Sequence, residues 1–360
     1  YQSVTFSRED FQFKTALASA RPVAGETPPI TEADVTDLLG HGAQASDGSY
    51  TAIASLFLPG KPAGPLSLRG RRHDDPNDWY RHQNRRELRG LYVLYSWVNN
   101  WDVKDHQTLD MYGKSETKSH LTHNLLDVDA SLGAAAQGPK RLDAGFENRV
   151  DFHWAAKRLV TLGFVREPWR RAKQETGIPS VGNFQSKVFD PGNFRASQEV
   201  PPFREMTDRD GYWGAKLVAS FSNAQIEAAV DAAHYEDPRA AQFLLPALIE
   251  RRERIERYWF DRVAPLDYFT VAHGILSFHD LALDLGLTER RQYDVELDAK
   301  PTTDRVPKRA RITSTSLTLP DTPATTLSLT LRVAGSHAAP ARVELQRQGS
   351  EWIVTRVRHA

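Results

Sequence analysis

Two short stretches decide how this chain of 360 residues is interpreted. Residues 97–110 read WVNNWDVKDHQTLD, and residues 125–133 read LLDVDASLG. The first contains the spacing Asp-x-Lys-x-x-Gln, and in the second an apolar pair leads into Asp-x-Asp. Phosphoryl transfer needs little covalent help from a protein, so its sites reduce to a carboxylate beside the nucleophile and further groups that hold Mg²⁺ on the phosphates. Asp102 and Asp127 match these two needs.

On these residues the chain resembles the kinase-like superfamily, in particular atypical bacterial members such as the CotH spore-coat kinases and the HipA-like kinases. The run from Asp102 to Gln107 is similar to the kinase catalytic-loop spacing Asp-x-Lys-x-x-Asn. Asp127, Val128 and Asp129 stand where a kinase carries the metal-binding Asp-Phe-Gly. Residues 74–78 and 85–88 also look like an uncharacterised bacterial family with this pattern.

The resemblance implies a role for each of these side chains in an ATP-dependent phosphotransferase. Asp102 would accept or orient the proton of an attacking hydroxyl, and Lys104 would neutralise charge on the transferring phosphoryl group. Asp127 would hold Mg²⁺ or Mn²⁺, with Gln107 and Asp129 as secondary metal ligands. The acceptor would be a hydroxyl group of a protein or a small molecule.

The departures from the kinase pattern support a second interpretation. Gln107 replaces the metal-binding Asn, and its extra methylene moves the amide oxygen by about one bond length. Upstream there is no Gly-rich loop and no Val-Ala-Ile-Lys strand. The nucleotide-holding lobe is therefore absent, reduced or cut from this chain, which opens at Tyr1 without Met. The alternative is a pseudokinase, a catalytically inactive kinase-derived protein with a binding or structural function.

A third, weaker interpretation is a metal-dependent hydrolase. His106, His120 and His123 lie near Asp110 and the Asp-x-Asp pair in the sequence. On a strand, however, His120 and His123 would point to opposite faces, unlike the two histidines one helical turn apart in zinc proteases.

Composition excludes several classes of function. Lys plus Arg equals Asp plus Glu at 46 each, so no overall charge attracts nucleic acid. The chain has no Cys, which removes thiolate chemistry and Cys-based metal sites. No apolar run reaches the roughly 18 residues of a membrane span, so we expect a soluble protein without a transmembrane segment. A bacterial cytoplasmic location and export after removal of an N-terminal segment both remain open.

Residue patterns predict an α+β fold with three parts. Residues 1–80 would form a partial small lobe and hinge, with a strand at residues 11–13, a helix at residues 31–39 and a hairpin from residues 49–58 and 66–68. Residues 81–300 would form a kinase-like, α-rich large lobe, and residues 310–360 a small antiparallel β module with period-two alternation.

Within the expected large lobe, helix-capping residues and apolar periodicity predict where the helices and strands lie. A helix over residues 81–98 leads to Asn99, and strands at residues 109–112 and 121–126 separate the two loops. Thr207, Ser222 and the pair Asp237-Pro238 each predict the start of a helix. The charged run over residues 250–257 predicts a solvated helix face with a Glu253–Arg257 pair.

Overall fold

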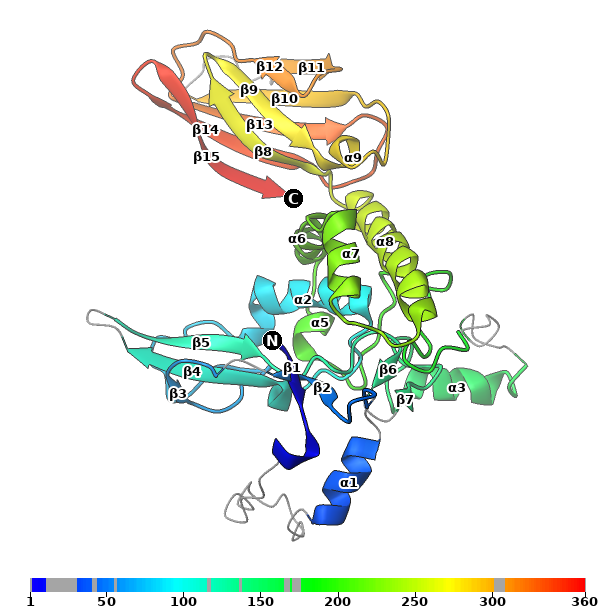
Figure 1. The fold of residues 1–360 in the computed structure, drawn as a ribbon. Helices are drawn as coiled ribbons and strands as arrows, with labels where there is room; N and C mark the ends of the chain where they lie inside the picture. The colour runs from blue at the N-terminus through cyan, green and yellow to red at the C-terminus, as the bar shows by residue number, and fades with distance from the viewer. Residues whose placement is uncertain are drawn as a thin grey trace. The chain divides into compact units, whose positions relative to one another are not determined.

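The computed structural model describes residues 2–10, 31–40, 44–54, 57–114, 118–135, 138–164, 169, 176–300 and 308–359. It mixes helices with antiparallel sheets, which confirms the α+β class (Figure 1). The chain divides into two compact units. The first comprises Tyr1–Ala63 and Met111–Thr122, and the second comprises Gly64–Asp110 and His123–Ala360.

The first unit is built from short strands and one helix. Strand β1 (Gln2–Phe6) pairs antiparallel with β2 (Tyr50–Ala54), and helix α1 (Glu32–Gly40) follows Thr31 as expected. The expected hairpin between residues 49–58 and 66–68 is wrong, because β1 takes the place of the second strand. The strand expected at residues 11–13 lies outside the described residues.

The two expected strands between the loops are present as β4 (Thr108–Lys114) and β5 (Ser119–Leu125). They form a three-stranded sheet in the order β3–β4–β5, in which β3 (Lys61–Pro62) pairs with Met111 and Tyr112 of β4. Residues 66–68, expected as a strand, instead bind the turn before β4. The backbone N–H of Leu66 donates to Thr108 Oγ1 at 2.8 Å, and that of Leu68 to Asp105 Oδ1 at 3.0 Å.

Three helices of the second unit begin where their capping residues predict, whereas the helix expected from residue 81 begins at Arg86. Thr207 forms a capping box with Asp210 at the start of α6 (Asp208–Ala219), and Ser222 forms one with Gln225 at the start of α7 (Asn223–Asp231). Asp237 caps α8 (Pro238–Phe260).

The remaining helical segments and short strands are η1 (Arg8–Asp10) of the first unit and, in the second unit, η3 (His82–Asn84), α2 (Arg86–Val98), η4 (Asp105–Gln107), β6 (Ala134–Ala135), β7 (Gly138–Pro139), α3 (Phe152–Val160) and α5 (Pro201–Arg204). No helix within the described ranges is both long and apolar enough to cross a bilayer.

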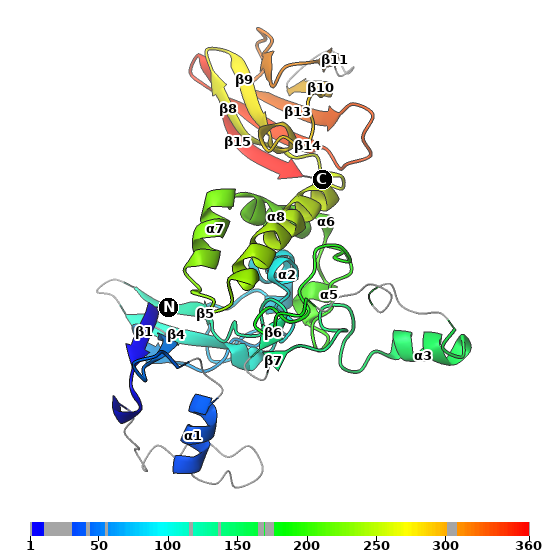
Figure 2. The same cartoon turned by 45° about the vertical axis from the view of Figure 1, so that its right-hand side comes forward.

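Helices α2, α6, α7 and α8 pack around one hydrophobic core, and Figure 2 shows α7 beside α8. Glycines allow α2 and α6 to approach closely. A Cβ atom at Gly214 would lie 2.6 Å from the carbonyl oxygen of Gly90, well inside van der Waals contact. The small residues at this crossing therefore set the distance between the two helices.

The charged run in α8 is buried at three positions, so the expected solvated face is wrong. Arg251, Arg252 and Glu256 are exposed by only 4%, 9% and 1%. Because α8 packs against α2, α6 and α7, its charged residues also turn inward. The pairs one helical turn apart are Arg254 with Glu250 and Arg252 with Glu256, instead of the expected Glu253 and Arg257.

The buried Arg251 closes the C-terminal end of α2, where backbone carbonyls lack helical partners. Its Nε donates to the Trp97 carbonyl at 2.7 Å, and one Nη donates to that of Ser96. The other Nη reaches the Gln185 carbonyl at 2.6 Å, and the guanidinium lies 3.7 Å from the ring centre of Phe189. Burial lowers the pKa of Arg251 to about 9, so the group remains charged at neutral pH.

A β-rich part begins at about residue 263 and not at residue 310. Strands β8 (Leu266–Ala272), β9 (Ile275–Asp280) and β12 (Ser316–Thr318) form a three-stranded sheet, with α9 (Leu281–Asp284) after β9. A five-stranded sheet has the order β11–β10–β13–β14–β15. Its strands are β10 (Tyr293–Lys300), β11 (Lys308–Ile312), β13 (Thr326–Val333), β14 (Ala341–Gln348) and β15 (Glu351–His359).

Both sheets contribute to one hydrophobic core, which explains the earlier boundary. Leu266, Phe278 and Tyr293 are buried together with Leu329 and Val343. Residues 266–300 were expected in the α-rich lobe, but their apolar side chains complete this core. The antiparallel β module is therefore larger than the expected module of residues 310–360.

Replacing Arg251 by Leu is expected to destabilise the protein. The change leaves the carbonyls of Ser96, Trp97 and Gln185 without this donor, and we expect a loss of about 3 kcal/mol or more in the free energy of unfolding. Urea denaturation of the full chain measures it. Arg254→Leu is the matched control, because Arg254 is 39% exposed and its pair with Glu250 is worth under about 1 kcal/mol. Equal effects of the two variants would contradict the proposed role of Arg251.

Candidate functional site

Asp102 lies in the loop after α2 and is surrounded by hydrogen-bond donors. Lys104 Nζ approaches its two carboxylate oxygens at 2.7 and 2.8 Å, and Gln107 Nε2 donates to Oδ2 at 3.0 Å. Ser197 Oγ donates to Oδ1 at 3.1 Å. Burial would raise the pKa of Asp102, but the hydrogen bonds from Lys104 and Ser197 outweigh it and hold the pKa below its usual value. Asp102 is therefore ionised at neutral pH.

Lys140 joins the loop that carries Asp102 to the loop that follows Asp127 and Asp129. Its Nζ donates to the carbonyl of Asn99 at 3.0 Å, to that of Leu132 at 2.7 Å, and to that of Ala130. Three acceptors match the three N–H groups of an ammonium ion. Burial and, after it, the Arg251 charge lower the pKa of Lys140 to about 7, while the negative charges of Asp129 and Asp102 oppose the shift.

Backbone contacts support the same junction. The N–H of Leu132 donates to the Val98 carbonyl at 2.5 Å, and that of Trp101 donates to the Ala130 carbonyl at 3.3 Å. The first of these bonds satisfies the last carbonyl of α2. The two stretches that the sequence singled out therefore lie side by side.

Asp127 and Asp129 interact directly and face solvent. A hydrogen bond between their side chains is the largest cause of the raised pKa of Asp127, followed by burial and the negative charges of Asp129 and Asp102. Asp102 is thus within electrostatic reach of Asp127. Both acids are exposed, and the apolar residues beside them do not bury them, because Leu125 and Val128 are themselves 43% and 41% exposed.

Three residues of these loops adopt left-handed backbone conformations. The φ angles of Asn99, Asp127 and Leu132 are 53°, 41° and 57°. For residues other than glycine this region is unfavourable, and it persists where the surroundings impose it. Strain of this kind is frequent at functional sites.

Gln107 is already engaged within its own loop. Its Oε1 accepts from the Lys104 N–H at 3.1 Å while its Nε2 binds Asp102. It orients Asp102, and as a metal ligand its oxygen would have to be shared. Among the described residues, no three His, Asp or Glu side chains converge in a way that could hold a metal ion. Mg²⁺ needs only one or two carboxylates when phosphate oxygens and water complete its shell.

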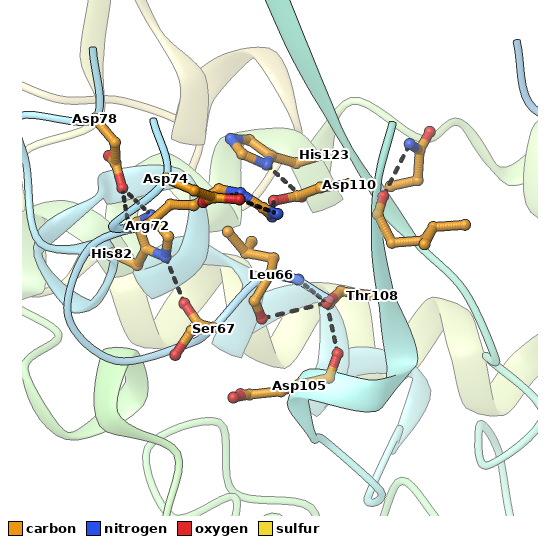
Figure 3. Close-up of polar contacts among 12 residues, drawn as sticks. Leu66, Ser67, Arg72, Asp74, Asp78, His82, Asp105, Thr108, Asp110 and His123 are labelled. Carbon is orange, nitrogen blue, oxygen red and sulfur yellow. Dashed lines mark hydrogen bonds and ion pairs between the residues drawn. The ribbon is translucent and has the colours of Figure 1, made fainter. Parts of the chain in front are cut away.

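Asp110 and His123, two members of the cluster proposed for a hydrolase, belong to an ion-pair network (Figure 3). Asp110 is fully buried, and Arg72 Nη1 and His123 Nδ1 bind its carboxylate at 2.9 and 2.6 Å. A guanidinium at this carboxylate competes with any cation. The network therefore disfavours a metal site at Asp110.

A second part of this network involves the buried His82 (Figure 3). Its Nε2 lies 2.7 Å from Asp78, and its Nδ1 lies 2.5 Å from the Ser67 carbonyl. Asp78 also binds Arg85 at 2.5 Å and the Arg72 N–H at 2.6 Å. These contacts hold together residues 67–85, the segment that precedes α2 in the sequence. We therefore assign His82 and Asp78 a structural role.

Sequence reasoning missed Lys140 and Ser197. Neither residue lies in a recognisable motif, and both reach the site through contacts distant in sequence. Sequence reasoning also did not single out Asn100. Its amide oxygen is buried without a hydrogen-bond partner among the described residues. Asn100 stands two positions before Asp102, so only its place in the first stretch signalled a role.

Comparison with protein-family models gives no match, and neither the curated proteins nor the solved structures give one. The resemblance to kinases therefore stays a prediction that rests on the two loops.

Replacing Lys140 by Met is expected to separate the two loops. Three carbonyls lose their donor, and we expect the free energy of unfolding to fall by about 3 kcal/mol. Chemical denaturation measures the loss, and Lys187→Met at an exposed position is the control. Unchanged stability in Lys140→Met would show that these carbonyls do not depend on the ammonium.

Proposed function

We propose that the two loops form the active site of an atypical kinase-like phosphotransferase, which uses ATP and Mg²⁺ to phosphorylate a hydroxyl acceptor. One observation carries the proposal: Lys140 holds together two loops whose carboxylates Asp102, Asp127 and Asp129 interact electrostatically. Gathered negative charge that faces solvent is unfavourable unless a proton or a cation compensates it. A divalent cation between the loops and a phosphate would do so.

The side chains divide the chemistry among them. The acceptor oxygen forms a bond to the γ-phosphorus as the bond to the leaving ADP oxygen breaks. Asp102, which its low pKa keeps ionised, would accept a hydrogen bond from the attacking hydroxyl, orient it, and take up its proton as the new bond forms. Lys104 would offset the charge of the transferring group. Asp127 and Asp129 would hold the metal ion, which would neutralise charge on the phosphate oxygens as a Lewis acid.

The donors fit a magnesium ion in number and type. Asp127 and Asp129 share a hydrogen bond that a cation would replace. Carboxylate oxygens on an exposed loop leave room for water and phosphate oxygens, which Mg²⁺ usually retains.

A catalytically inactive binding or structural protein is the second candidate. The sequence shows no Gly-rich loop, and the donors around Asp102 already satisfy its carboxylate. A metal-dependent hydrolase is less well supported, because Arg72 binds the central Asp110.

Calorimetric titration of the full chain with Mn²⁺, and with ATP in its presence, tests the proposal. We expect weak Mn²⁺ binding that Asp127→Asn abolishes, because the variant loses an anionic ligand, together with feeble ATP binding. Asp321→Asn at an exposed position of the β-rich part is the control and should bind as wild type does. Tight ATP binding that Asp127→Asn leaves unchanged would refute the metal role, and absence of metal binding would favour the inactive protein.

The same site predicts a pH dependence of metal binding. Because the pKa of Asp127 is raised, the shared proton is held at low pH and lost as pH rises through that raised pKa. A cation must displace this proton, so Mn²⁺ affinity should increase with pH across that range. The variant Asp129→Asn lacks the carboxylate that raises the pKa of Asp127, so the increase of Mn²⁺ affinity with pH should occur at lower pH than in wild type. Because one anionic ligand is lost, the Mn²⁺ affinity itself should be weaker than that of wild type. A pH profile identical to that of wild type would contradict the carboxyl pair.

A further inference from the structure

A groove of about 640 Å³ lies between α2, α6 and the C-terminal end of β15 in the second unit. Its cationic lining comes from Arg86, Arg89, Arg209, Lys216 and Arg358. Its acidic lining comes from Glu87, Asp210 and Asp267. A concave volume of this size accommodates a small organic molecule.

Ion pairs inside the groove leave two guanidinium groups uncompensated. Lys216 binds Asp267, and Arg89 lies 3.4 Å from Asp210. By contrast, the guanidinium groups of Arg209 and Arg358 make no hydrogen bond or ion pair within the described part of the chain. Both are exposed, so they add positive charge to the groove without an internal partner.

Polar and ring contacts hold two of the residues that line the groove, Tyr212 and His359. Tyr212 is 3% exposed, and its hydroxyl donates to Asp267 Oδ2 at 3.2 Å. The His359 ring packs 4.5 Å from the Tyr212 ring, and its Nε2 lies 2.9 Å from the Leu266 carbonyl. Burial lowers the pKa of His359, so the ring is neutral at pH 7 and adds no charge to the lining.

An aromatic ring borders the same groove. Trp213 is partly exposed, and the Arg86 guanidinium lies 5.0 Å from its ring centre. This contact and the close packing of the ring against Gly90 hold Trp213 in place, and the exposed part of its side chain lines the groove. The groove therefore combines an anion-binding side with an apolar side.

We propose that this groove binds a small phosphate monoester, with Arg209 and Arg358 on the phosphate and Trp213 against the organic group. A phosphate monoester carries close to two negative charges at neutral pH, which matches two free guanidinium groups, and the planar donors of Arg suit phosphate oxygens. The inference concerns a second site and does not rest on the proposed phosphotransferase activity.

Isothermal titration of the full chain with phenyl phosphate, inorganic phosphate and sulfate tests the site. Phenyl phosphate should bind more tightly than inorganic phosphate, because only the ester contacts Trp213. The double variant Arg209→Gln/Arg358→Gln should weaken phenyl phosphate binding at least tenfold, since each charge-assisted hydrogen bond contributes about 1.5 kcal/mol or more. Substitution of exposed side chains generally changes stability little, and thermal unfolding of the double variant verifies that it folds.

Two controls separate this site from the other features of the chain. Arg254→Gln removes a single positive charge outside the groove and should leave binding unchanged. Asp127→Asn should also bind phenyl phosphate as wild type does, so failure of the proposed active site and failure of this groove give different results. Equal affinity in wild type and the double variant, or no binding of phenyl phosphate at millimolar concentration, would overturn the proposal.

Discussion

The closed C-terminal end of α2 is the constraint on which the rest of the second unit depends. Arg251 of helix α8 donates hydrogen bonds to the carbonyls of Ser96 and Trp97, and the N–H of Leu132 donates to the carbonyl of Val98. A helix end buried without such donors would be unstable. The same contacts determine where the chain leaves α2, and so where Asp102 lies.

Local signals in the sequence were sufficient for most of the helices. Thr207, Ser222 and Asp237 cap α6, α7 and α8 where their side-chain chemistry predicted, because capping depends on residues only a few positions apart. Burial depends on partners far along the chain, so a charged run such as that around Arg251 gave no local sign that it faces the core. For the same reason residues 266–300 showed no link to the strands that follow residue 310.

Some residues of the candidate site could likewise be predicted from local spacing, whereas others are brought to the site only by the tertiary fold. The spacing from Asp102 to Gln107 predicted one compact loop, and its side chains do bind one another. Lys140 and Ser197 could not be predicted, since their partners are backbone carbonyls or side chains brought close only by the tertiary fold. Spacing thus identifies candidate groups, whereas the contacts that orient them require the structure.

The left-handed residues Asn99, Asp127 and Leu132 bear on the dynamics of these loops. Such backbone conformations cost about 1 kcal/mol each, so the loops have little intrinsic preference for their folded path. Local opening needs only the loss of a few anchoring contacts, while the helical core stays intact. Amide hydrogen exchange within these loops would then proceed through subglobal opening, and the site would lose its geometry well before the protein as a whole unfolds.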